Sequence, residues 1–96
     1  MKKSDANVLF EIYKLQNELN RNIYPEDLIN RQVLSKQGGQ GKVRELLESD
    51  FLEANNNQGA NIYHVSVKGI DSMCAYRDIR IEYDRYNEEQ EEFVLD

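Results

Sequence analysis

A stretch of positive charge in the first half of the chain has the residue types that contact nucleic acid. From Leu28 to Arg44 the sequence contains four basic residues and no acidic one. Lysine and arginine bind phosphates or guanine, and glutamine can pair with adenine, so this stretch predicts contact with DNA. The residues that we expect at the DNA are Ser35, Lys36, Gln37, Gln40, Lys42 and Arg44. The alternative is a solvated helix face next to a flexible loop.

The glycines within this stretch, in Gly38-Gly39-Gln40-Gly41-Lys42, also resemble a loop that binds phosphate through backbone N–H groups. A nucleotide-binding P-loop needs a glycine five residues before its Gly-Lys pair, and a hydroxyl residue after the pair. Lys36 and Val43 occupy those two positions. The sequence therefore argues against nucleotide binding, while a DNA phosphate could still bind these amides.

No combination of residues predicts catalysis. His64 and Cys74 are the single histidine and the single cysteine, and no glycine elbow or oxyanion motif accompanies them. Carboxylates such as Glu26 beside Asp27, or the run at 88–92, fit helix ends and surface charge better than acid–base chemistry. One cysteine and one histidine also fall short of a zinc ligand set. We therefore expect a protein that is not an enzyme and uses no metal or cofactor.

Length and charge narrow the class of protein further. Ninety-six residues suffice for one modest core, so we expect a single domain. No apolar run suits a membrane span or a signal peptide, which predicts a cytoplasmic protein. The net charge of -6 arises after residue 68, where three arginines face nine acidic residues, because residues 1–68 contain nine charges of each sign. An acidic end thus follows a neutral part that contains the basic stretch.

Three helices are predicted in the first half of the chain. The first starts near Asp5, which suits a helix N-terminus. Its apolar face consists of Val8, Ile12, Leu15 and Leu19. Pro25, followed by two acidic residues, predicts a second helix that ends at about Gln32. After the glycine cluster, helical spacing from Val43 predicts a third helix up to Ser49.

A β-hairpin and a long helix are predicted in the second half. Asp50 stands where the chain leaves the third helix, and aspartate tolerates the left-handed backbone conformation needed there. Residues 51–54 and 63–67 fit two strands joined by the polar turn at 55–59. From 70 to 93, spacings of three and four predict one continuous helix. Its seam consists of Tyr76, Ile79, Tyr83, Tyr86, Gln90 and Phe93.

This order of three helices, a hairpin and a long helix matches the winged helix-turn-helix. Within it, the segment Tyr63–Gly69 resembles the junction of strand and last helix in PadR-like and MarR-like regulators. The segment Leu47–Leu52 is similar to their passage from recognition helix to wing, with Asp50 where they usually have glycine. The resemblance covers residues 25–86. It implies a mainly α fold with a small β-hairpin, DNA contact through the third helix, and a long C-terminal dimerisation helix.

The tyrosines of the last helix predict a homodimer. Aromatic rings with a polar edge suit an interface. A helix over 70–93 would also be longer than a three-helix head can cover, so part of its seam needs a partner chain. The expected interface residues are Tyr76, Ile79, Tyr83 and Tyr86. The alternative is that this helix packs on the first helix of its own chain.

The sequence thus predicts one domain, with a winged head at 5–68, a C-terminal helix at 69–93 and a tail at 94–96. We expect a homodimer that binds double-stranded DNA sequence-specifically and regulates transcription. The rival hypothesis is an acidic winged-helix module or inhibitor, of phage or mobile-element type, that binds another protein or mimics DNA. Acidic residues near the third helix would repel phosphates, so the position of the acidic end discriminates between the two.

Overall fold

The recognition region and the hairpin are arranged around one long N-terminal helix. The computed structural model describes residues 1–19, 23–31, 39–57 and 60–95, with all of their side chains except those of 39, 40, 56, 57, 60, 61 and 92–95. The elements are α1 (Lys3–Leu19), α2 (Pro25–Asn30), α3 (Gly39–Glu48), β1 (Leu52–Asn57), β2 (Ala60–Val65), α4 (Val67–Met73) and α5 (Arg77–Leu95). This order confirms the predicted winged helix-turn-helix with a long last helix. Of the helices just named, none has the length and apolar character that crossing a membrane requires.

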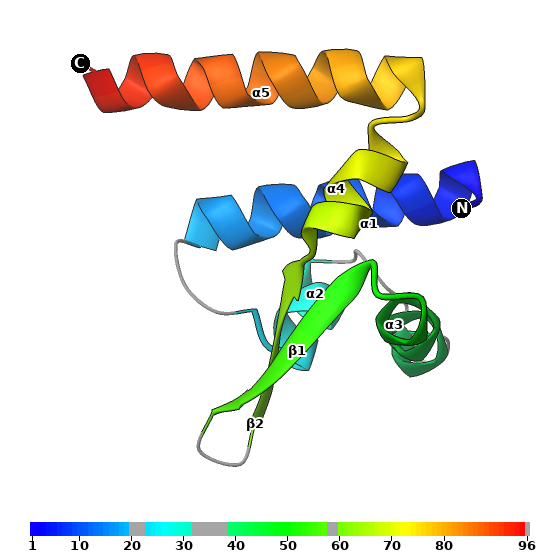
Figure 1. Cartoon of the computed structure of the whole chain (residues 1–96). Helices are drawn as coiled ribbons and strands as arrows, with labels where there is room; N and C mark the ends of the chain where they lie inside the picture. The colour runs from blue at the N-terminus through cyan, green and yellow to red at the C-terminus, as the bar shows by residue number, and fades with distance from the viewer. Residues whose placement is uncertain (20–22, 32–38, 58–59, 96) are drawn as a thin grey trace.

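Helix α1 lies at the centre of the molecule, between α5 on one side and α2 with the hairpin on the other (Figure 1). It therefore buries more than the single face predicted from its spacing. The buried residues of α1 are Ala6, Leu9, Phe10, Ile12 and Leu15. Val8 and Leu19, which belong to the predicted face, are only half-buried. A helix packed on two sides needs a wider apolar surface than one that covers a core from outside.

Helices α2 and α3 form the helix-turn-helix. Pro25 stands at the first position of α2, and the backbone N–H of Tyr24 donates to the Asp27 carboxylate, 2.9 Å away. The structure ends α2 two residues before the predicted end. Helix α3 begins at Gly39, four residues before the predicted start. The sequence predicts a break at the glycines, but Gly39 and Gly41 are part of the helix. Leu46 attaches α3 to the common core.

The hairpin extends further toward its turn than predicted, but its second strand ends at Val65 and not at Val67, because Ser66 caps α4 and Val67 begins that helix. β1 and β2 pair antiparallel over six residue pairs, so the ladder continues through polar residues that the sequence assigned to the turn. Tyr63 of β2 also donates its backbone N–H to the carbonyl of Ile23, 2.9 Å away. This single bridge joins the segment before α2 to the hairpin.

The base of the hairpin is held by a close approach of three segments. Asp50 has a φ of 62°, the left-handed conformation predicted for it. Its carbonyl accepts a hydrogen bond from the Ser66 hydroxyl at 2.6 Å, and the same hydroxyl oxygen accepts from the Gly69 N–H at 2.9 Å. Ser66 is thus the N-cap of α4 and at the same time ties α4 to the turn after α3.

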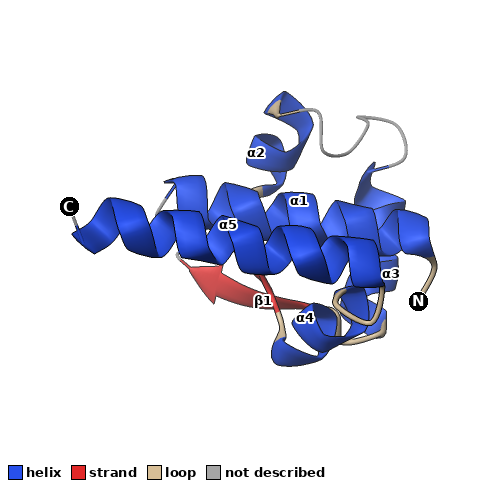
Figure 2. Cartoon of the chain, turned by 90° about the horizontal axis from the view of Figure 1, so that it is seen from above, coloured by secondary structure: helices blue, strands red, loops and turns tan. Residues whose placement is uncertain are grey.

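The last helix is interrupted, contrary to the continuous helix predicted over 70–93. α4 ends at Met73 and α5 begins at Arg77, so Cys74 lies at the end of α4 rather than within the last helix. The interruption lets α4 pack across α1, while α5 lies alongside α1 and runs in the same direction (Figures 1 and 2). Met73 and Ile79, on either side of the turn, both reach the core.

Gly69→Ala and Gly41→Ala form a matched pair for stability. A Cβ on Gly69 would lie 2.2 Å from the backbone carbonyl oxygen of Phe51, whereas a Cβ on Gly41 meets nothing within 4 Å. Because backbone cannot rotate away, we expect Gly69→Ala to lower the free energy of unfolding by about 1–3 kcal/mol. Gly41→Ala should raise it by about 0.5–1 kcal/mol, since alanine is the better helix former. Urea denaturation measures both, and a Gly69→Ala protein as stable as the wild type would contradict the close approach.

Candidate nucleic-acid interface

The outward face of α3 carries charges of both signs. Over residues 41–48 of α3, the exposed residues are Gly41, Arg44, Glu45 and Glu48. Because successive residues turn by about 100°, Glu45 and Glu48 point away from the buried Val43 and Leu46, and Arg44 lies on one flank. A carboxylate there repels phosphate, although it can accept a hydrogen bond from the amino group of cytosine. The face is therefore less basic than the stretch 28–44 predicts.

Lys42, a predicted DNA contact, is bound to acidic residues of its own chain. Its Nζ lies 2.7 Å from Oδ1 of Asp5 in α1 and 3.2 Å from Oε2 of Glu45 in α3. The hydrogen bond to Asp5, and then that to Glu45, raise the pKa of Lys42 above its ordinary value. The side chains of Lys42 and Asp5 are 32% and 19% exposed, so the pair lies partly inside the junction of α1 and α3.

Of the other predicted DNA contacts, only Arg44 has a side chain that the structure describes. Arg44 is exposed, and within the described part of the chain it has no ion pair. Ser35, Lys36 and Gln37 lie outside the described residues, as does the side chain of Gln40 in the first turn of α3. The structure thus places Lys42 and Arg44 on the same helix, α3, where Lys42 already pairs with Asp5 and Glu45.

Two residues near this surface were missed in the sequence. Asp5 lies 37 positions from Lys42, and no local pattern connects them. Lys68 follows the hairpin and donates to the Ser49 carbonyl at 3.0 Å, with its Nζ 5.1 Å from the centre of the Phe51 ring. Lys68 therefore places a cation at the end of α3, close to the base of the hairpin.

The acidic end of the chain is held away from α3. Both views show the C-terminal end of α5 at one end of the molecule and α3 toward the opposite end (Figures 1 and 2). The exposed residues Glu88, Glu89 and Glu91 lie in this distal part of α5. The acidic residues of the distal part of α5 are thus away from α3, whereas Asp78 at the start of α5 pairs with Lys3 at 2.7 Å, near the end of α1 that contacts α3 through Asp5.

The seam of α5 contacts α1 of the same chain. Ile79 is 3% exposed and belongs to the core. The Tyr83 ring lies 5.1 Å from the Tyr13 ring, and Tyr86 meets Phe10 edge-on with ring centres 6.5 Å apart. Burial raises the pKa of both Tyr83 and Tyr86. The alternative considered from sequence, packing on the first helix, is therefore the arrangement in this chain.

Hydrogen bonds fix the register of α5 on α1. The Tyr76 hydroxyl donates to the Met1 carbonyl at the start of α5, and the Tyr13 hydroxyl donates to Oδ1 of Asn87 at 2.8 Å. Near the same point, the Tyr86 hydroxyl is 3.4 Å from the carbonyl of Lys14. The four predicted interface residues thus already have neighbours within one chain.

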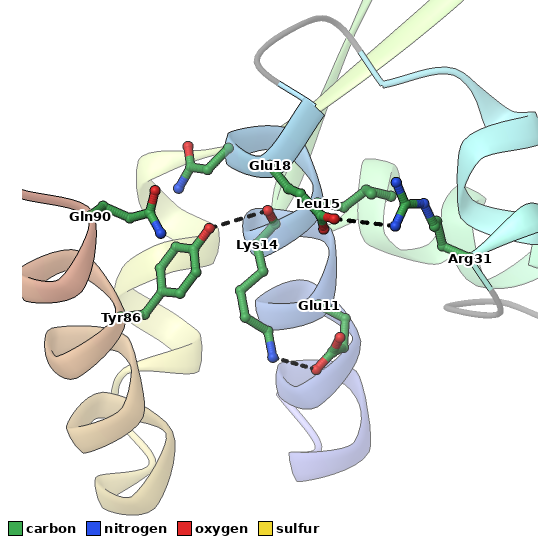
Figure 3. Close-up of a pocket in the computed structure, with 8 residues that line it drawn as sticks. Glu11, Lys14, Leu15, Glu18, Arg31, Tyr86 and Gln90 are labelled. Carbon is green, nitrogen blue, oxygen red and sulfur yellow. Dashed lines mark hydrogen bonds and ion pairs between the residues drawn. The ribbon is translucent and has the colours of Figure 1, made fainter. Parts of the chain in front are cut away.

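A groove of about 600 Å³ lies between α1, the end of α2 and α5 (Figure 3). Its lining residues are Glu11, Lys14, Leu15, Asn17, Glu18, Arg31, Tyr86 and Gln90. Lys14 pairs with Glu11 at 2.8 Å, and Arg31 pairs with Glu18 at 3.2 Å. All four charges in the groove are therefore matched. Among the described side chains, no three His, Cys, Asp or Glu residues gather as a metal site would require.

Two solved structures are similar to the chain in fold. MepR of S. aureus, bound to ethidium bromide, has a TM-score of 0.64 at 13% identity; the match covers 94% of this chain but 64% of the MepR chain. A Thermoplasma acidophilum protein, provisionally assigned as a transcriptional regulator, has a TM-score of 0.51 at 17% identity over 92% of each chain. No family model matches the chain, and no curated protein matches its sequence. At these identities the comparisons show the winged-helix fold, and they do not address the PadR-like resemblance.

Ile79→Ala and Ile81→Ala test whether the seam is used within one chain. Ile79 is 3% exposed, whereas Ile81, two residues later on the same helix, is 49% exposed. We expect Ile79→Ala to cost about 2–5 kcal/mol of unfolding free energy and Ile81→Ala less than about 0.5 kcal/mol. If Ile79 contacts α1 of its own chain, as it does in this structure, the cost of Ile79→Ala will not depend on protein concentration, whereas in a dimer that exchanges α5 it will. Thermal denaturation at several concentrations provides the measurement, and a concentration-dependent difference would assign the contact to a dimer.

Proposed function

We propose that the chain is a DNA-binding regulator of transcription that places α3 in the major groove. The observation that carries this proposal is the position of the acidic residues at the C-terminal end of α5, at the opposite end of the molecule from α3 (Figure 1). Physiological salt, whose Debye length is about 8 Å, screens the repulsion between charges at one end of the molecule and phosphates bound at the other. The winged-helix fold, shared with a provisionally assigned regulator, supports the same proposal.

The proposed DNA surface is α3 together with the segment before it. Arg44 supplies an exposed guanidinium on one flank of the helix. The predicted contacts Ser35, Lys36, Gln37 and Gln40 stay part of the proposal, since they precede or begin α3 in the sequence. Because few cations are present and Glu45 and Glu48 point outward, non-specific binding should be weak, and recognition should depend more on base contacts.

The rival proposal is a protein-binding module, and the carboxylates on α3 favour it. A basic partner would pair with Glu45 and Glu48, the two residues that α3 turns outward. In that case neither the wild type nor Arg44→Ala would bind DNA. DNA titration at low salt therefore discriminates between the two proposals.

We also propose that the chain forms a homodimer through Tyr76, Ile79, Tyr83 and Tyr86. These residues pack on α1 of their own chain, so a dimer that uses them requires α5 of each copy to pack on α1 of the other. Such an exchange would bury Ile79, Tyr83 and Tyr86 against α1 of the other copy.

Light scattering after gel filtration tests the homodimer directly. We expect a mass of about twice 11.3 kDa, with the dimer fraction falling on dilution. A mass of one chain at all concentrations would reject the homodimer and leave a monomeric regulator.

Arg44→Ala and Arg85→Ala test the DNA surface. Both remove one exposed positive charge, but Arg85 lies on α5, away from α3. Arg44→Ala should weaken binding to every duplex and reduce the slope of log K against log salt by about 0.9, since one phosphate contact is lost. Arg85→Ala should leave both quantities unchanged. Fluorescence anisotropy with a labelled duplex at low salt provides the values, and equal effects of the two variants would contradict docking through α3.

A further inference from the structure

The contact between Lys42 and Asp5 restricts the cations that α3 can present. Lys42 lies next to the exposed face of α3, but its Nζ is held at 2.7 Å by the Asp5 carboxylate from α1. We infer that Asp5 withholds Lys42 from DNA, so that the affinity of α3 for phosphate is set by a residue of α1. This inference rests on the proposed function, because it concerns the strength of the same DNA contact.

The position of Lys42 on the helix makes it a suitable phosphate ligand once it is released. Lys42 and Arg44 are two residues apart, which places them about 200° apart around the helix axis. They therefore lie on opposite flanks of the exposed face, as phosphate ligands on the two sides of a major groove must. With Lys42 bound to Asp5, only the Arg44 flank offers a cation.

Of the two carboxylates that contact Lys42, that of Asp5 is the one that holds it. The Asp5 side chain is 19% exposed, whereas that of Glu45, the second partner, is 68% exposed. Exposed pairs three residues apart on a helix are weak, so Glu45 alone would not compete with a phosphate. The raised pKa of Lys42, due first to Asp5, agrees with this order. Removal of the Asp5 charge should therefore release Lys42.

Asp5→Asn, Lys42→Ala and the double variant form the test. Anisotropy with a labelled 24-base-pair duplex across a NaCl series gives K and its salt slope for each protein. We expect Asp5→Asn to bind several-fold more tightly than wild type and to steepen the slope by about 0.9, since one phosphate contact is gained. Lys42→Ala alone should leave the slope unchanged. In the Asp5→Asn background, Lys42→Ala should abolish the gain, because the gain acts through Lys42. The double variant has the net charge of the wild type, so it is the unchanged slope of Lys42→Ala alone that excludes an effect of net charge.

Two further measurements keep the outcomes separate. Circular dichroism checks that each variant is folded, and Asp5→Ser is the substitute if Asn is not accepted at the start of α1. Acetic anhydride should modify Lys42 of wild type more slowly than Lys42 of Asp5→Asn in the absence of DNA. Equal reactivity, equal slopes, or a gain that persists in the double variant would overturn the inference alone. Absence of binding by wild type and Asp5→Asn to any duplex would overturn the proposed function together with it.

Discussion

Helix α1 is packed on two sides, and the positions of the other elements follow from this constraint. One helix of 17 residues contacts α5 on one side and α2 with the hairpin on the other (Figure 1). Leu9 and Ile12 have no exposed surface, and truncation at such positions typically costs about 2–5 kcal/mol. Because both layers share α1, a single core extends through the molecule.

The polar residues of α1 join the same elements as its apolar residues do. Four contacts show this: Asp5 with Lys42 of α3, Tyr13 with Asn87 of α5, Gln16 with the Val65 N–H of β2, and Glu18 with Arg31 after α2. Two of these four remove a cation from the stretch 28–44. The charge that the recognition region can offer to DNA is consequently lower than its composition, and it is determined by α1, which carries the opposite charges.

The elements that depend on local sequence were predicted well, and those that depend on distant contacts were not. The left-handed conformation of Asp50 and the order of helices and strands follow from short-range preferences. Helix α3 begins earlier than expected, since its glycines are helical once Val43 and Leu46 are packed. No glycine or proline marks the break after Met73 in the sequence. The break is imposed instead by the packing of α4 and α5 on α1. Neither did any pattern identify Asp5 as the partner of Lys42, 37 residues away.

The seam of α5 illustrates what an apolar pattern can and cannot specify. Its spacing correctly predicts that the helix packs along another helix, but not to which chain that helix belongs. The expectation of a partner chain relied on length, and α5 with 19 residues is only about 28 Å long, close to the length of α1 beside it. The three residues 74–76 connect α4 to α5, which lies on α1 of its own chain in this structure. Since an exchanged dimer would bury the same seam, contact energies do not favour either state, and protein concentration selects between them.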